Sequence, residues 1–233
     1  MSGTPIRLFL ARHAEPAWQI EGVSYSDPVL TARGRRQAEL LAERLAAEPI
    51  DEILCSPTNR TVETAGFVAK ALGIEPTVVP GLAEIGMPDF TGEPADKVDA
   101  FFRDAYRRPP EQWWEGHPGS GETFRQFHDR VAAAIVDLLA QRGITPHRDR
   151  LADHLWSMET GPRRILVVGH AGTNAVALGF LLGLEPTPWE WERFVLGHAS
   201  LAALGTFPLG GAHIFTLRWF NDREHLPAEL RSR

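Results

Sequence analysis

The stretch Ile6-Arg7-Leu8-Phe9-Leu10-Ala11-Arg12-His13 is a short apolar run that ends abruptly in two basic residues. An apolar run of this length, bounded by polar residues, is typical of a buried β-strand. We therefore expect a strand over Ile6–Ala11, followed by a functional loop that begins with Arg12 and His13.

Outward from this stretch, short apolar runs alternate with amphipathic segments. One helix is expected to begin after Thr31, its N-cap, because Ala38, Leu41, Ala42 and Leu45 then share one face. A second helix is expected to start at Ser56-Pro57, the cap and first turn, and to run to about Leu72. A further helix is expected over Thr173–Leu182. The other strands are expected at Glu52–Cys55, Thr77–Val79, Arg164–Val168, Ser200–Thr206 and His213–Trp219.

This alternation predicts an α/β fold with three layers, in which a mainly parallel central sheet carries helices on both faces. In such sheets, ligands bind at the carboxyl ends of the strands. Polar residues able to act on a phosphate fall just past a predicted strand or in the first turn of the next helix. They are Arg12, His13, Arg60, Glu84 and His170.

The segment at about 87–161 has a different character, because it is rich in Pro, Gly and Trp. Helices are expected in it near Asp96–Tyr106 and Glu122–Gln141. We interpret the segment as a helical insertion that covers the active-site edge of a single domain spanning 1–233.

Composition limits the classes of partner. The net charge of −6 argues against a nucleic-acid binder, although a few arginines can still make one cleft attractive to a small anion. The single cysteine, Cys55, permits no intramolecular disulfide and is expected to be buried in a strand. The longest apolar stretch, Ile165–Leu184, is interrupted by His170, Thr173 and Asn174, which disfavours a membrane span. With no signal peptide in evidence at Met1–Leu10, a cytoplasmic location is expected.

Phosphoryl transfer without a metal needs three kinds of group. Fixed donors must neutralise the phosphate oxygens, and arginine suits this task because its planar fork matches them. A nucleophile must attack in line, as a neutral imidazole does near pH 7. The leaving oxygen needs a proton, which a carboxylic acid with a raised pKa supplies. The residues at the predicted strand ends include all three kinds.

The chain resembles the histidine phosphatase superfamily, the phosphoglycerate mutase-like fold, in the branch with the Arg-His-Gly motif. The resemblance rests on motifs that occur in the expected order along nearly the whole chain: Leu8–Glu15, Leu30–Gly34 with Gln37-Ala38, Ser56–Ala65, Leu82–Glu84, Gly121–Thr123 and Val167–Gly172. Each motif is weak alone, whereas the ordered set is specific.

The resemblance implies a role for each matching residue. His13 would take the phosphoryl group as a phosphohistidine, and Arg12, Arg60 and His170 would clamp the phosphate. Glu84 would protonate the leaving alkoxide and then activate water. The resemblance adds Gln19 and Ala171 to the substrate-binding residues, and it implies no metal and no organic cofactor.

Two positions depart from the family pattern. Ala14 stands where glycine is usual, and Gln19 follows Trp18 where asparagine is common. Alanine is tolerated wherever the local φ is negative. Gln19 can still donate an amide hydrogen bond to phosphate, with a longer arm.

The sequence leaves three functions to compare. The first is a phosphomonoesterase acting on a small phosphate ester; the second is a bisphosphoglycerate-dependent phosphoglycerate mutase; the third is a non-catalytic binding module. A mutase would need extra basic residues around its substrate, and Arg103, Arg107 and Arg108 could serve, although a solvated helix face is the simpler interpretation. Trp113 and Trp114 fit either a lid or an anchor. The remaining histidines are treated as ordinary, but the loop that carries His198 is expected near the active edge of the sheet, where a surface position is equally open. A homodimer stays an open alternative.

Overall fold

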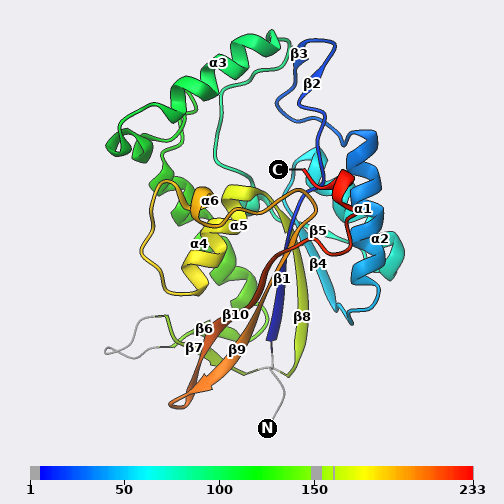
Figure 1. Ribbon diagram of the computed structural model, residues 1–233. Helices are drawn as coiled ribbons and strands as arrows, with labels where there is room; N and C mark the ends of the chain where they lie inside the picture. The colour runs from blue at the N-terminus through cyan, green and yellow to red at the C-terminus, as the bar shows by residue number, and fades with distance from the viewer. Residues whose placement is uncertain (1–5, 148–153, 160, 233) are drawn as a thin grey trace.

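The computed structural model describes residues 6–147, 154–159 and 161–232. Its centre is an eight-stranded sheet in the order β5-β4-β8-β1-β9-β10-β7-β6 (Figure 1). The strands are β1 (Ile6–Arg12), β4 (Glu52–Cys55), β5 (Thr77–Val78), β6 (Ile144–Pro146), β7 (Trp156–Met158), β8 (Arg163–Gly169), β9 (Leu201–Leu209) and β10 (Ala212–Asp222). All six strands expected from the sequence are present.

The half of the sheet whose strands lead into the predicted site residues is parallel. Strands β5, β4, β8 and β1 pair in parallel, and β9, β10, β7 and β6 extend the sheet from β1 by antiparallel pairing. The predicted α/β fold is therefore confirmed, and its parallel part consists of β5, β4, β8 and β1. The parallel register matters for the site, because it pairs Arg12 with Gly169 and Cys55 with Val168.

Side-chain alternation along β1 shows why helices cover both faces. Leu8 and Leu10 join one buried cluster, and Phe9 and Ala11 join the other. The first cluster is completed by α4 (Phe124–Ala140) and α5 (Ala171–Leu181), and the second by α1 (Ala32–Leu45) and α2 (Asn59–Leu72). Because successive residues of a strand point to opposite faces, one apolar run supplies both cores. Cys55 lies buried in the α1–α2 cluster, as expected.

The start of α1 agrees with its predicted cap. The Thr31 hydroxyl accepts a hydrogen bond from the Gly34 amide at 2.9 Å, an interaction worth about 1 kcal/mol in helices of this kind. Gly34 itself is required by a close approach, since a Cβ there would lie 2.1 Å from the carbonyl oxygen of Glu15. The motif Leu30–Gly34 thus joins α1 to the loop that follows β1.

The predicted start of α2 was wrong by two residues. The helix begins at Asn59 after Thr58, and it ends at Leu72 before Gly73, whose φ is 70°. Ser56 does not cap the helix, because its amide continues the sheet by donating to the carbonyl of Val168 at 3.0 Å. Its side chain is consequently available to the site described below.

The segment 87–161 contributes to two different places. Helix α3 (Ala95–Tyr106) and the turn η2 (Pro110–Glu115) stand above the carboxyl ends of the strands, whereas α4, β6 and β7 belong to the layers of the sheet (Figure 1). Residues 148–153 and 160 of the expected insertion lie outside the described residues. Across from α3 stands a hairpin of β2 (Gln19–Ile20) and β3 (Val23–Ser24), which meets it through a bridge between Val23 and Pro94.

The remaining short helices are η1 (Pro80–Leu82), α6 (Glu190–Arg193) and η3 (Ala228–Leu230). No helix in the described part of the chain combines the length and the apolar character that crossing a bilayer requires.

Candidate active site

The carboxyl ends of β1, β8 and β4 bring residues from distant parts of the chain together. His13 directly follows β1 and His170 directly follows β8, and their ring centroids lie 5.2 Å apart. The His13 amide donates to the carbonyl of Gly169 at 2.9 Å, which continues the strand pairing into the site. Both imidazoles are buried, with 3% and 1% of their surface exposed.

The hydrogen bonding of His13 identifies its basic nitrogen. Nδ1 lies 2.8 Å from the carbonyl oxygen of Ala14. A carbonyl oxygen can only accept, so Nδ1 carries the proton and Nε2 carries the lone pair. Burial, the largest cause, and the positive charges of Arg60 and Arg12 lower the pKa of His13 well below its ordinary value. The ring is therefore neutral at pH 7, the state that a nucleophile requires.

The backbone at Ala14 accepts alanine without strain. Ala14 is not among the described non-glycine residues with positive φ, and its amide donates to the Thr64 hydroxyl at 3.1 Å. The expectation that alanine in place of glycine would be tolerated at negative φ holds here.

His170 has a partner that the sequence did not suggest. The hydroxyl of Ser56, at the end of β4, lies 2.7 Å from Nε2 of His170. Nδ1 of His170 is buried without a hydrogen-bond partner among the described residues. Burial and the charges of Arg60 and Arg12 lower the pKa of His170 well below its ordinary value, so this ring is also neutral.

Arg60 supplies a positive charge in the first turn of α2. It is 3% exposed, its guanidinium lies 4.7 Å from the centroid of the Trp18 ring, and Nη1 lies 3.4 Å from Oδ1 of Asp27. A buried polar atom without a partner costs free energy unless a ligand satisfies it. The Nε of Arg60 is such an atom in the described structure.

Arg12 is held in place by the segment before β9. Its Nη1 donates to the carbonyl of Leu196 at 2.6 Å, and its Nη2 lies 3.2 Å from Nε2 of His198. Guanidinium groups only donate, so Nε2 of His198 accepts, and the proton on Nδ1 faces the hydroxyl of Ser232 at 2.9 Å. Burial and the charge of Arg12 lower the pKa of His198 to about 3.

Of the two placements that the sequence left open for His198, the structure has the one near the active edge of the sheet, and the surface placement is wrong. It is 5% exposed, and its ring centroid lies 5.5 Å from that of His13. No spacing in the sequence identifies it, because its partner Arg12 is 186 residues away and meets it only through the antiparallel pairing of β9 with β1.

The carboxylate of Glu84 lies at the N-terminus of α5. Oε2 accepts from the Gly172 amide at 2.9 Å, and Oε1 accepts from the amides of Thr173 at 3.1 Å and Ile85 at 3.0 Å. Burial nevertheless raises the pKa of Glu84 above its ordinary value of 4.5. Gly172 is needed for this approach, because a Cβ there would lie 2.4 Å from Oε1.

Arg130 of α4 supports the loop that carries Glu84. Its guanidinium donates to the carbonyls of Gly81, Ala83 and Glu84 at 3.1, 3.0 and 3.3 Å. Glu122 binds Arg130 at 2.9 Å and accepts from the Gly86 amide at 2.7 Å. These contacts explain the Gly121–Thr123 motif, although the sequence did not point to Arg130.

A cavity of about 620 Å³ opens beside Arg60 and Glu84. Its walls come from the β2–β3 hairpin, the loop after Glu84 and α3, and they include Gln19. The Gln19 side chain is exposed, and its Nε2 donates to Oδ1 of Asp99 at 3.0 Å. A second hollow of about 350 Å³ is lined by Arg12 and Ala171 together with Tyr106 and Trp191.

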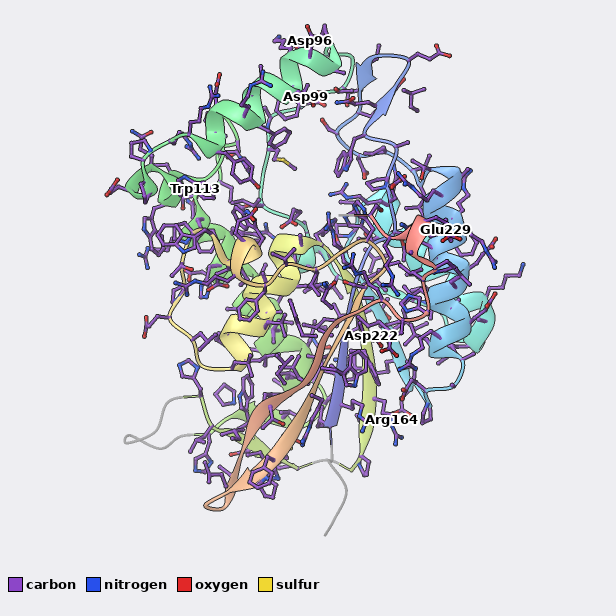
Figure 2. The ribbon with its side chains drawn as sticks, in the orientation of Figure 1. Asp96, Asp99, Trp113, Arg164, Asp222 and Glu229 are labelled. Atoms are coloured by element: carbon purple, nitrogen blue, oxygen red, sulfur yellow. The ribbon has the colours of Figure 1, made fainter. Side chains whose placement is uncertain are left out.

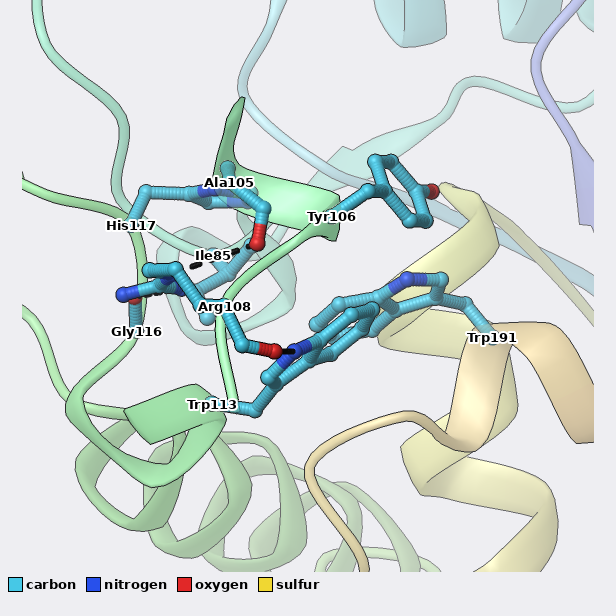
Figure 3. A pocket seen from close by; sticks show the side chains of 8 residues that line it. All are labelled: Ile85, Ala105, Tyr106, Arg108, Trp113, Gly116, His117 and Trp191. Atoms are coloured by element: carbon cyan, nitrogen blue, oxygen red, sulfur yellow. Dashed lines mark hydrogen bonds between the residues drawn. The ribbon is translucent and has the colours of Figure 1, made fainter. Parts of the chain in front are cut away.

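The arginines of α3 do not line the large cavity. Arg103 and Arg107 are exposed, and Arg107 lies 3.9 Å from Asp104. Arg108 donates to the backbone carbonyls of Ala105 and Gly116 (Figure 3). These observations favour a solvated surface position for Arg103 and Arg107 and a structural role for Arg108 over contacts with a substrate.

The tryptophans of η2 act as anchors. Trp113 stacks on Trp191, with centroids 6.4 Å apart, and its indole nitrogen donates to the carbonyl of Arg108 (Figure 3). Trp114 packs against Phe124 of α4. Neither tryptophan borders the 620 Å³ cavity.

Within the described ranges, no group of three or more His, Cys, Asp or Glu residues is arranged to hold a metal ion. The groups gathered at the strand ends comprise one nucleophilic imidazole, two guanidinium groups, a second neutral imidazole and one carboxyl group with a raised pKa. This set can bind a phosphate, attack it and protonate a leaving oxygen.

Comparison with known proteins gives relatives of two kinds. A family model described as the histidine phosphatase superfamily (branch 1) matches residues 8–219. The chain is 29% identical over 194 residues to a probable phosphoglycerate mutase GpmB of Yersinia enterocolitica, covering 78% of this chain and 77% of the relative. It is 33% identical over 135 residues to phosphoserine phosphatase 1 of Hydrogenobacter thermophilus, covering 57% and 64%. A solved structure of a putative alpha-ribazole-5'-P phosphatase from Escherichia coli K-12 superposes with a TM-score of 0.68 at 26% identity, covering 94% and 97%.

Proposed function

The chain belongs to the histidine phosphatase superfamily, branch 1, and on that premise we propose that it is a metal-independent phosphomonoesterase. It hydrolyses a small phosphate ester through a phosphohistidine intermediate at His13. The observation that carries this proposal is the hydrogen bond from Nδ1 of His13 to the Ala14 carbonyl, which leaves Nε2 as a neutral nucleophile beside Arg60 and His170.

In the first half of the reaction, Nε2 of His13 attacks the phosphorus atom and a P–N bond forms. The bond between phosphorus and the ester oxygen breaks, and the leaving alkoxide takes the proton of the Glu84 carboxyl group. The raised pKa of Glu84 keeps that proton available. The products are a free alcohol, a phosphohistidine and an ionised Glu84.

In the second half, the Glu84 carboxylate takes a proton from a water molecule whose oxygen attacks the phosphorus atom. The P–N bond breaks, releasing inorganic phosphate and neutral His13. Glu84 is again protonated, so the cycle closes without any other reactant.

Arg12, Arg60 and His170 hold the phosphoryl oxygens in both halves. We assign the ring proton of His170 to Nδ1, so that Nε2 accepts from the Ser56 hydroxyl 2.7 Å away and the buried Nδ1 is a donor toward phosphate. Fixed donors of this kind stabilise charge that develops in the transition state. Ala171, at the first turn of α5, completes the binding set next to Arg12.

The names of the relatives also include a phosphoglycerate mutase, and one feature of the site bears on this alternative. A mutase must hold a carboxylate and a second phosphate close to the nucleophile, yet Arg60 is the basic side chain among the described residues that line the large cavity. This arrangement favours hydrolysis. A binding module has no need of both a nucleophile and an acid, so the complete set supports an enzyme.

The wider proposal is a single domain over 1–233, in which the loop after Glu84 and α3, the first part of the segment at about 87–161, form one side of the large cavity. We place its action in the cytoplasm on small-molecule esters, without nucleic-acid or membrane partners. A homodimer remains a hypothesis that sedimentation can test.

The test is phosphate release from a panel of phosphomonoesters in EDTA, with His13→Ala as the control. We expect EDTA-resistant release that falls by about 10⁴-fold or more in the variant, as when other catalytic nucleophiles are removed. Vanadate should compete with substrate. Bisphosphate-stimulated interconversion of phosphoglycerates without release would establish the mutase instead, and silence in both assays would favour the binding module.

A further inference from the structure

The large cavity is much bigger than a phosphate group, and most of its wall is apolar. Aromatic side chains enter it from three separate segments: Trp18 beside the hairpin, Phe90 in the loop after Glu84, and Phe102 on α3. Phe90 and Phe102 lie with ring centroids 5.8 Å apart. Other apolar walls come from Ile85, Met87, Pro88 and Val98. Pockets with such walls bind ligands by burying apolar and aromatic surface.

The charges around this wall are acidic. Besides Arg60 and Glu84, which belong to the chemistry, the charged residues that line the cavity are Asp89 and Asp99. Hydrogen bonds from the Thr91 amide and side chain and from the Ser26 hydroxyl hold the pKa of Asp89 below its ordinary value. A carboxylate on the leaving group would therefore face two further carboxylates.

The basic residues near the cavity have partners outside its wall. Lys97 on α3 pairs with Glu93 at 2.7 Å, and Arg107 lies near Asp104. Arg108 is bound to backbone carbonyls. None of these side chains is part of the wall of the large cavity, so the described residues of that wall offer no cation besides Arg60.

The two aspartates of the cavity wall come from different elements, and each accepts a hydrogen bond from the hairpin or the residues that follow it. Asp99 lies on the face of α3 toward the β2–β3 hairpin, where it accepts from Gln19 (Figure 2). Asp89 accepts from Ser26, which follows the hairpin, at 2.8 Å. A donor-rich group in this cavity therefore meets carboxylate acceptors from two elements of the wall, the loop after Glu84 and α3.

We infer that the leaving group is a neutral, ring-bearing alcohol whose ring packs against Trp18, Phe90 and Phe102 and whose hydroxyl or N–H groups face Asp89 and Asp99. The inference rests on the proposed phosphatase function and narrows its substrate class. Esters with a carboxylate on the leaving group, such as 3-phosphoglycerate, are selected against by charge. The aromatic wall and the two aspartates determine specificity and take no part in bond breaking.

The test compares two esters that differ only in one remote charge, 2-phenylethyl phosphate and 2-(4-carboxyphenyl)ethyl phosphate. The two methylene groups insulate the leaving oxygen from the ring substituent, so its basicity is the same in both. The carboxylates of Asp89 and Asp99 are partly screened by solvent, and their repulsion of the ester's carboxylate should lower kcat/KM for the charged ester by about tenfold. Asp99→Asn should reduce this discrimination about threefold, whereas Asp96→Asn, on the same helix but outside the cavity wall, should leave it unchanged.

Ethyl phosphate provides a second comparison, because it lacks the ring. Phe102→Ala should lower the ratio of kcat/KM for 2-phenylethyl phosphate over ethyl phosphate about tenfold, since part of the wall is removed. Both discriminations are ratios measured within one preparation. Loss of folded protein therefore cancels from each ratio.

Equal turnover of the two phenylethyl esters, or 3-phosphoglycerate as the better substrate, would overturn the inference. So would an Asp99→Asn effect that Asp96→Asn reproduces. These outcomes differ from failure of the proposed function, in which no ester, including an aryl phosphate, releases phosphate in a His13-dependent manner. Faster turnover of a phosphotyrosine peptide than of the small ring ester would overturn the assignment to a small molecule.

Discussion

The two ends of the active-site cavity are built from different parts of the fold. The phosphate end comes from β1, β4, β8 and the helices that follow them, so its side chains are set by strand register and are buried. The leaving-group end comes from a short hairpin, a loop and α3, which meet through contacts such as the exposed Gln19–Asp99 hydrogen bond. The phosphate end is rich in donors and the other end is apolar and acidic.

This difference shows that the residues that react with phosphate and the residues that select the leaving group lie in separate parts of the fold. Phosphate is the same in every ester, so the sheet can hold a fixed set of donors against it. Leaving groups differ, and the elements that contact them lie outside the sheet. Variants of the groups that hold phosphate should therefore affect every substrate, and variants at the leaving-group end should affect substrates selectively. The acid Glu84 is a separate case, because its effect depends on the basicity of the leaving oxygen.

Glu84→Gln should have the largest effect among the following changes, and it should depend on the leaving group. We expect kcat/KM for alkyl phosphates to fall by about 10²–10⁴-fold, because an alkoxide needs a proton, and to fall much less for aryl phosphates. Steady-state kinetics on a matched alkyl and aryl pair would measure this. Equal losses on both esters would mean that Glu84 is not the acid.

The pH dependence of turnover should also show that Glu84 acts as the acid. Turnover of alkyl esters requires protonated Glu84, so it should decrease as the pH rises through that raised pKa, which lies above 4.5. It also requires neutral His13, so it should decrease as the pH falls through a pKa well below 6.5. Glu84→Gln should remove the alkaline limb and leave the acidic limb. An alkaline limb that persists in the variant would belong to another group.

Arg60→Ala should lower kcat/KM by about 10²–10³-fold for every ester and should raise the inhibition constant of vanadate. Arg60 is a buried cation beside Trp18, so its removal takes fixed donors away from the phosphate end. Arg36→Ala, which removes an exposed arginine paired with Glu39, is the control and should change neither value. A substrate-selective loss in Arg60→Ala would move Arg60 from the phosphate end to the other end.

His198→Ala should lower kcat/KM by about tenfold for all esters, because supporting partners of active-site groups contribute on that scale. His198 is a positioning residue that accepts from Arg12. His198→Gln keeps an acceptor and should restore part of the activity and of the vanadate affinity. If His198 had a purely structural role, both variants would have a lower thermal midpoint, and His198→Gln would recover neither activity nor vanadate affinity.

Gln19→Ala should have the smallest effect. Its hydrogen bond to Asp99 is exposed, so we expect at most about a threefold change in kcat/KM for ring-bearing esters and no change in vanadate inhibition. Weaker vanadate binding would show that Gln19 donates to phosphate, the role that the family resemblance implies, and would join this residue to the phosphate end.

Most elements of the fold were predictable, because their signals are local. The apolar run at β1, the Thr31 cap of α1 and the apolar faces of α1 and α2 are readable over a few residues. The start of α2 was missed because Ser56 has two uses open to it, capping and sheet pairing, and only the neighbouring strand β8 selects the second. The two places taken by segment 87–161 also depend on packing that no local period encodes.

The sequence alone determined the family, the order of the strands along the chain, and the candidates His13, Arg12, Arg60, Glu84 and His170. Those signals reside in motif order and in the periods of 2 and 3.6 residues. Only the tertiary structure decided that Ser56 meets His170, that His198 holds Arg12 and that Arg130 supports the Glu84 loop. The physical reason is that each pair joins residues far apart in the chain, which strand register and helix packing bring into contact. The apolar and acidic character of the leaving-group end has the same origin, since its wall is assembled from three segments that carry no shared pattern.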